Sequence, residues 1–104
     1  MIYEMRTYRL RTGMMPTYLK LVEEEGIALQ KSHLGELIGY FFSEIGVLNQ
    51  IVHIWAYVSL DDREARRNAL AADPRWQTFA PKIQACIDTM ENKILKPASF
   101  SPLP

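Results

Sequence analysis

The 104-residue sequence lacks most of the features that assign a function directly. Its single cysteine, Cys86, cannot form an internal disulfide, and nothing calls for an oxidising compartment. Charge of one sign is also missing, because 12 basic and 12 acidic residues cancel. We therefore expect no nucleic-acid partner and no membrane partner. No apolar run approaches the roughly 20 residues of a membrane span.

Several catalytic signatures are absent as well. No Gly-rich phosphate loop occurs, and Ser43 and Ser59 show no nucleophile-elbow context. Neither a second histidine nor a carboxylate stands at metal-ligand spacing from His53, so we predict no metal and no cofactor. The chain starts directly with a strand pattern rather than a leader, so we expect a soluble, cytoplasmic protein.

Hydrophobic residues make up 48% of the sequence, enough for one domain with a buried core. We predict this domain over residues 1–97 and an extended, proline-containing tail over residues 98–104. Within the domain we predict strands over residues 2–10, 35–44, 48–57 and 90–95, a helix from Pro16 to near His33, and a second helical region after Ser59 that is split at Asp73-Pro74. This order is the ferredoxin-like β-α-β-β-α-β layout, an α+β fold with a four-stranded antiparallel sheet.

The strand over residues 48–57 has no ordinary solvent face. One side carries Asn49, His53, Trp55 and Tyr57, and the other is aliphatic. We expect the helices to cover the first side and a second copy of the chain to cover the other. Two sheets packed face to face would form a homodimeric α+β barrel.

The mixed faces of the first and third strands would line a cleft under the helices. We select His53 as a general base and Arg6 or Asn49 as groups that stabilise an oxyanion. The candidate ligand-binding residues are Glu4, Tyr8, Trp55, Tyr57, Arg63 and Trp76. Structural alternatives stay open: Glu4 can pair with Arg6, His53 can be a satisfied core histidine, and Arg63 can belong to a solvated basic face.

Four stretches in combination resemble the NIPSNAP family. They are Ile2-Tyr3-Glu4-Met5-Arg6-Thr7-Tyr8, His33-Leu34-Gly35, and the run from Glu44 to Tyr57, with Asp73-Pro74-Arg75-Trp76 following. The resemblance covers nearly the whole chain and implies the dimeric α+β barrel fold. The wider barrel superfamily includes cofactor-independent monooxygenases, haem-degrading enzymes and small-molecule isomerases, whose sites lie between sheet and helices.

Two functions follow as hypotheses. In the first, the chain binds or transforms a small apolar or aromatic molecule, in a monooxygenase-like or isomerase-like manner by analogy of fold. In the second, it is a dimeric interaction or scaffold protein without catalysis. An open pocket would favour the first hypothesis. Full pairing of the side chains of Glu4, Arg6, Asn49 and His53, with no cavity beside them, would favour the second.

Overall fold

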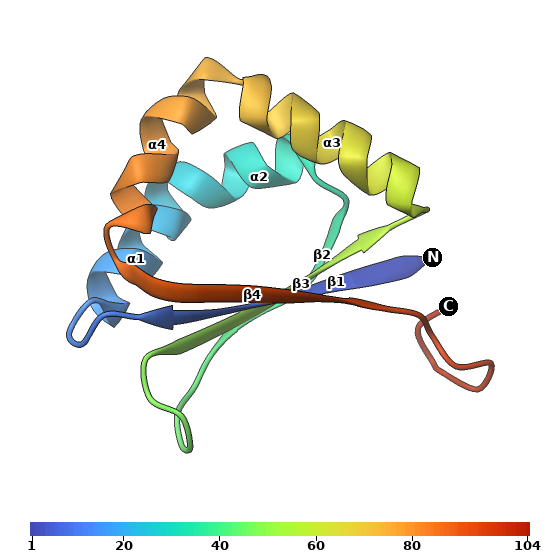
Figure 1. The fold of residues 1–104 in the computed structure, drawn as a ribbon, viewed down its shortest axis with the longest axis horizontal. Helices are drawn as coiled ribbons and strands as arrows, with labels where there is room; N and C mark the ends of the chain where they lie inside the picture. Colours follow the sequence, from blue (N-terminus) through green and yellow to red (C-terminus); the bar gives the residue numbers. More distant parts are fainter.

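A computed structural model describes residues 1–104 and has the expected α+β architecture. The elements are β1 (Ile2–Leu10), α1 (Met15–Leu21), the π-helical η1 (Val22–Gly26), α2 (Ile27–His33), β2 (Glu36–Phe42), β3 (Gln50–Tyr57), α3 (Leu60–Ala72), α4 (Pro74–Gln84) and β4 (Ile87–Leu95). The four antiparallel strands lie in the order β2-β3-β1-β4. All helices cover one face of this sheet (Figure 1). The ferredoxin-like prediction is confirmed.

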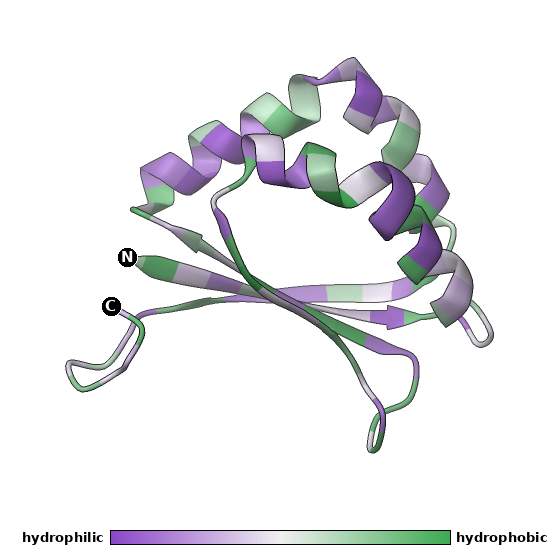
Figure 2. Cartoon of the chain, turned by 180° about the vertical axis from the view of Figure 1, so that it is seen from behind, coloured by the Kyte–Doolittle hydropathy of each residue, from purple (hydrophilic) through white to green (hydrophobic).

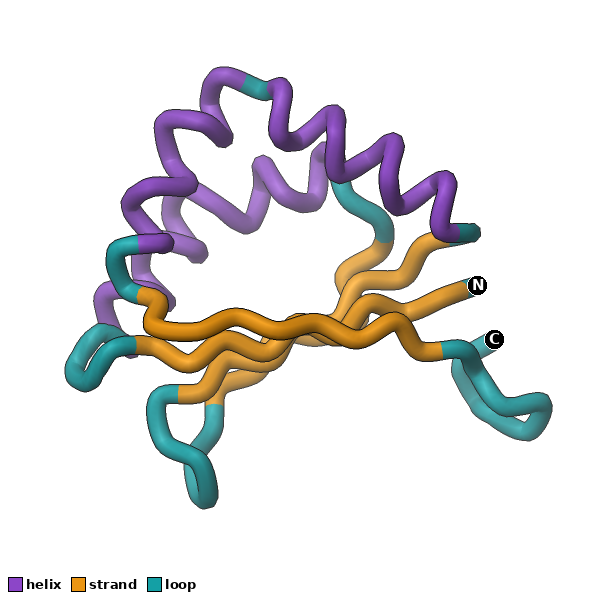
Figure 3. Tube along the Cα trace, viewed as in Figure 1, coloured by secondary structure: helices purple, strands orange, loops and turns teal.

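The helical layer follows the predicted caps. The Ser59 hydroxyl accepts the Asp62 N–H at 3.1 Å and begins α3, and Asp73 Oδ1 accepts the Arg75 N–H at 2.9 Å and begins α4. Pro74 follows Asp73 in the first turn, so the predicted split of the second helical region is confirmed (Figure 3). None of the helices is both long and apolar enough to cross a membrane.

The first helical region is continuous to His33 and contains the π-helical stretch η1. Gly26 ends this stretch where the helix meets α4. A Cβ atom at Gly26 would lie 2.6 Å from the ring of Phe79, so only glycine lets the two helices approach so closely.

Element boundaries differ from the predictions at several places. The second strand covers Glu36–Phe42 instead of residues 35–44. The third strand begins at Gln50, because Asn49 has a φ of 62° and belongs to the preceding turn. The last strand begins at Ile87 instead of Met90, because pairing with β1 extends it. The C-terminal segment is not fully extended: a Ser101 N–H donates to the Ala98 carbonyl, and the Tyr3 hydroxyl donates to the Pro104 carbonyl.

The two faces of β3 are used as predicted by its alternation. His53, Trp55 and Tyr57 point to the helices and are at most 1% exposed, whereas Val52 and Ile54 lie on the other face and are only half-buried. The loop after β2 and the C-terminal segment both project on this uncovered side (Figures 1 and 2). Both carry exposed apolar side chains, Ile45 at 91% and Phe100 at 90% exposure.

Candidate functional site

A row of side chains crosses all four strands on the helix-covered face. Tyr40 on β2 lies opposite His53 on β3, His53 lies opposite Arg6 on β1, and Arg6 lies opposite Asn92 on β4. Residues paired across antiparallel strands share a face and lie close together. Strand register alone therefore brings a phenol, an imidazole, a guanidinium and an amide into one line under the helices.

Glu4 forms the charged centre at one end of this row. Its fully buried carboxylate accepts hydrogen bonds from Arg63 Nη2 at 2.6 Å, Asn92 Nδ2 at 2.8 Å and Arg6 Nη1 at 3.1 Å. Burial alone would raise the pKa of Glu4. The donated hydrogen bonds and the charges of Arg6 and Arg67 outweigh burial and lower the pKa to about 2. Glu4 is therefore ionised and held by partners from three separate elements.

The three arginines of α3 divide between two tasks. Arg63 and Arg67 turn inward, with Arg67 Nη1 3.8 Å from Glu4 Oε1. Arg66 instead pairs with Asp62 one turn earlier, at 2.8 Å, and is 45% exposed. The basic face is thus solvated only at Arg66, and the expected pairing of Glu4 with Arg6 is confirmed.

His53 is held in one orientation by its neighbours. Its Nδ1 lies 2.8 Å from the indole nitrogen of Trp55, and its ring stacks on Tyr40 with centroids 4.5 Å apart. An indole N–H can only donate, so Nδ1 accepts. Burial lowers the pKa of His53, and the charge of Arg6 lowers it further, to about 3. The ring is therefore neutral and carries its proton on Nε2.

The Nε2–H group of His53 has no hydrogen-bond partner, although the residue is 1% exposed. His53 lines a cavity of about 130 Å³ between the sheet and the helices. Its polar walls are Arg6, Tyr8, Gln30, His53, Arg67 and Gln84, and its apolar walls include Leu70, Trp76, Ile83 and Ile87. No group of three or more His, Cys, Asp or Glu side chains gathers as a metal site in the structure.

The structure brings most of the sequence-predicted residues together. The cavity is lined by Arg6, Tyr8, His53 and Trp76, and Trp55 donates a hydrogen bond to Nδ1 of His53. Glu4 and Arg63 form the ion-paired cluster beside the cavity, and Tyr57 is buried with an unpartnered hydroxyl.

The structure corrects the predicted placement of Asn49 in the site. Asn49 lies in the turn before β3, does not line the cavity, and uses its backbone carbonyl to accept the Leu10 N–H at 2.7 Å. The alternation argument failed because the strand starts at Gln50, two residues later than predicted, which leaves Asn49 outside it.

Sequence reasoning missed Gln30 and Gln84 as cavity residues, and Asn92 as a partner of Glu4. Arg67 also lines the cavity, four residues after Arg63 on one side of α3. The others come from elements whose position over the sheet is decided by packing.

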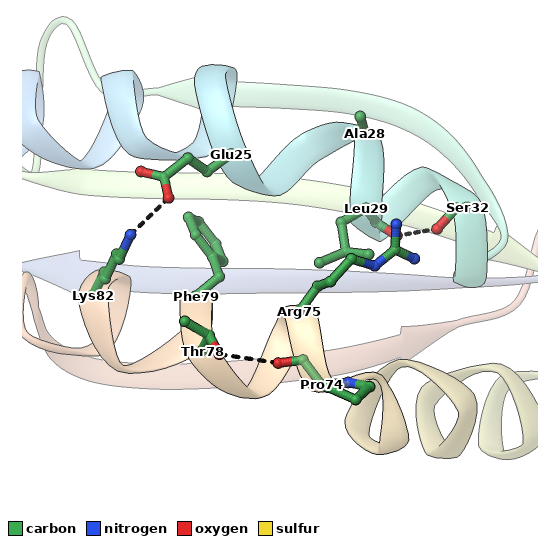
Figure 4. A pocket seen from close by; sticks show the side chains of 9 residues that line it. All are labelled: Glu25, Ala28, Leu29, Ser32, Pro74, Arg75, Thr78, Phe79 and Lys82. Atoms are coloured by element: carbon green, nitrogen blue, oxygen red, sulfur yellow. Dashed lines mark hydrogen bonds and ion pairs between the residues drawn. The ribbon is translucent and has the colours of Figure 1, made fainter.

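A larger concavity of about 730 Å³ lies between α2 and α4 (Figure 4). Its polar groups are satisfied within the chain. Lys82 pairs with Glu25 at 2.7 Å across the groove, Ser32 donates to the Leu29 carbonyl, and Thr78 donates to the Pro74 carbonyl. Arg75, at its rim, is engaged with Asp73. The groove is open helix–helix surface, whereas the smaller cavity is lined by His53 with its unpartnered Nε2–H.

The fold places the chain in a structural class. An antibiotic biosynthesis monooxygenase superposes with a TM-score of 0.66 over 94% of this chain and 99% of that one, at 14% identity, which shows the shared ferredoxin-like fold alone.

The family is defined by closer matches. The NIPSNAP family model matches residues 3–102, and the chain belongs to the NIPSNAP family. A NIPSNAP family protein with unknown function from Agrobacterium tumefaciens is 67% identical, with a TM-score of 0.98 over 100% of this chain and 94% of that one. Protein NipSnap of Drosophila melanogaster is 37% identical over 97% of this chain. The chain spans 36% of that relative and 44% of the Dictyostelium discoideum homologue, so it corresponds to less than half of either.

Proposed function

We propose that the chain binds a small organic molecule in the cavity between the sheet and the helices, with the neutral His53 ring donating a hydrogen bond to it. The observation that carries this proposal is the unpartnered Nε2–H group, buried in a residue that is 1% exposed. A buried donor without an acceptor costs about 1–3 kcal/mol, which an oxygen atom of a ligand would recover.

The same donor defines the chemistry that the site could support. Because Nδ1 of His53 accepts the Trp55 N–H, the ring has no free lone pair facing the cavity. We therefore replace the expected general base with a hydrogen-bond donor. Beside the guanidinium of Arg6, such a donor would polarise a carbonyl group or stabilise an oxyanion that forms from it. This arrangement would assist the isomerisation or the oxygenation of a carbonyl compound.

A fragment screen tests the binding proposal. Small aromatic and aliphatic carbonyl compounds would be tested by ligand-observed NMR against the wild type, His53→Phe and Lys82→Met. The last variant alters the open groove between α2 and α4 and is the matched control. Binding by the wild type and Lys82→Met, with loss in a folded His53→Phe variant, supports the proposal. Equal binding by all three proteins, or by none, refutes it.

A second candidate is the dimeric scaffold protein. It is favoured by the three donors that pair with Glu4 Oε2 and by a cavity of about 130 Å³, which is smaller than the roughly 300 Å³ of typical ligand pockets. Failure of every fragment to bind would favour this candidate.

Either function would operate in a homodimer, which we propose from the uncovered sheet face. Val52 and Ile54 are only half-buried there, and Phe41 is 56% exposed. Exposed contiguous apolar surface of this kind marks an interface in soluble proteins. Sedimentation at low micromolar concentration should give twice the 12.0 kDa of one chain, and Ile54→Glu should give a folded monomer. A monomeric wild type would refute the dimer.

A further inference from the structure

The charges around the cavity do not balance. Arg6, Arg63 and Arg67 all lie within 3.8 Å of the Glu4 carboxylate, which is the one acidic group in the cluster. The fourth partner of Glu4, Asn92, is uncharged. Three positive charges around one negative charge leave an excess of two, in a region that is largely shielded from water. Effective charge interactions are stronger there than at the surface.

Two of the three arginines border the cavity. Arg6 and Arg67 both line it, with side chains 13% and 29% exposed, and no acidic side chain does. Arg67 reaches Glu4 only at 3.8 Å, a distance too long for a hydrogen bond, so its guanidinium can bond to another oxygen. A guanidinium matches a carboxylate with two parallel hydrogen bonds.

One neutral group at the cavity adds to this preference. The unpartnered His53 Nε2–H is a further donor. Gln30, which also lines the cavity, has a buried and unpartnered Oε1, an acceptor that does not bond to a carboxylate. The donors at the cavity therefore come from β1, β3 and α3.

The apolar walls of the cavity favour an organic anion over an inorganic one. An inorganic ion has no apolar part to pack against the surface formed by Leu70, Ile83 and Ile87. The volume of about 130 Å³ is close to the roughly 150 Å³ of a cavity known to hold benzene. We infer that the ligand is a small organic carboxylate, with its charged end at Arg67 and His53 and its apolar end against α4. This inference rests on the proposed function and narrows it to a ligand class.

Calorimetric titration with matched probes tests the inference. Butyrate and benzoate would be compared with their neutral isosteres, butyramide and benzamide, and with inorganic phosphate. For the wild type we expect each carboxylate to bind at least about tenfold more tightly than its amide, as charge-assisted hydrogen bonds imply. Arg67→Gln should remove that difference. Arg66→Gln is the matched control, because Arg66 lies on the same helix but does not line the cavity.

The outcomes separate this inference from the proposed function. Amides that bind as tightly as carboxylates would overturn the ligand class while leaving small-molecule binding intact. No binding by any probe would overturn both. Phosphate binding without carboxylate binding, or full carboxylate affinity in folded Arg67→Gln, would also overturn the inference. As a second readout, benzoate should shift the His53 Nε2–H signal in the NMR spectrum of the wild type, and an unmoved signal contradicts the assigned contact.

Discussion

Glu4 and His53 lie on the same face of the sheet, on neighbouring strands, and both are at most 1% exposed. Glu4 has three hydrogen-bonding partners and a further arginine nearby. His53 has one hydrogen bond, from Trp55, and a second ring nitrogen without a partner. A buried charge persists only with such compensation, whereas a neutral imidazole can leave one donor free at a cost of about 1–3 kcal/mol. The Glu4 cluster therefore has the pairing expected of a structural contact, whereas His53 keeps a free donor, as expected of a binding site.

The partners of the two groups also come from different places. Glu4 joins β1, β4 and α3, so its cluster ties the helical layer to the sheet. His53 is held by Trp55 on its own strand and by Tyr40 on the next. Removing the charge of Glu4 should therefore damage the fold, whereas changes at His53 should act mainly on the cavity.

The largest effect is expected for Glu4→Gln. The variant keeps the shape of the side chain but leaves three arginines without their counter-charge, so the free energy of unfolding should fall by about 3–5 kcal/mol in urea denaturation. Glu25→Gln, which breaks the exposed pair with Lys82, should cost less than about 1 kcal/mol. Equal losses in the two variants would contradict the role given to Glu4.

A smaller effect, about 2 kcal/mol, is expected for Trp55→Phe, which leaves a small cavity and an unpartnered Nδ1 on His53. Without the indole donor, the proton of His53 is free to occupy either ring nitrogen. The ¹⁵N chemical shifts of the imidazole should therefore change from the Nε2–H pattern towards a mixture of tautomers. An unchanged pattern would mean that Trp55 does not fix the tautomer.

The two regions should also separate by pH. Burial depresses the pKa of His53 from 6.5 to about 3, so its stabilising contribution is complete above pH 6.5 and is lost as the pH falls towards 3. The pKa of Glu4 falls from 4.5 to about 2, so its contribution is lost only between those values.

Between pH 6.5 and 4.5 the wild type should thus lose up to about 1.4 kcal/mol per pH unit relative to His53→Phe. Unfolding free energies measured at pH 7, 6 and 5 would give this slope. Parallel curves for the two proteins would show that His53 does not titrate as its burial implies.

The smallest effect is expected for Asn49→Gly. Glycine accepts the φ of 62° and keeps the carbonyl that binds the Leu10 N–H, so stability should change by less than about 0.5 kcal/mol. Fragment binding should stay the same, because Asn49 does not line the cavity. A loss of binding in this variant would show that Asn49 contributes to ligand binding.

Most of the fold could be predicted from local patterns. The alternation of β3 correctly identified the helix-covered row of His53, Trp55 and Tyr57, and the caps at Ser59 and Asp73 located the starts of α3 and α4. These features depend on neighbours within a few residues, so they can be predicted from the sequence alone. The prediction for Asn49 failed because one turn residue with positive φ ends the alternation; asparagine adopts this conformation more readily than most residues, and the alternation argument did not use that signal.

The site was predicted only in part. The sequence determined which residues of one strand share a face, because strand periodicity fixes side-chain direction, and it grouped Arg6 with Glu4 and Tyr8, and His53 with Trp55 and Tyr57. Only the tertiary structure decided which groups surround them. Asn92 meets Glu4 from 88 residues away, and Gln30 and Arg67 enter the cavity from two different helices. Such neighbours depend on strand order and helix docking, which follow from the packing of the whole core rather than from any local stretch of sequence.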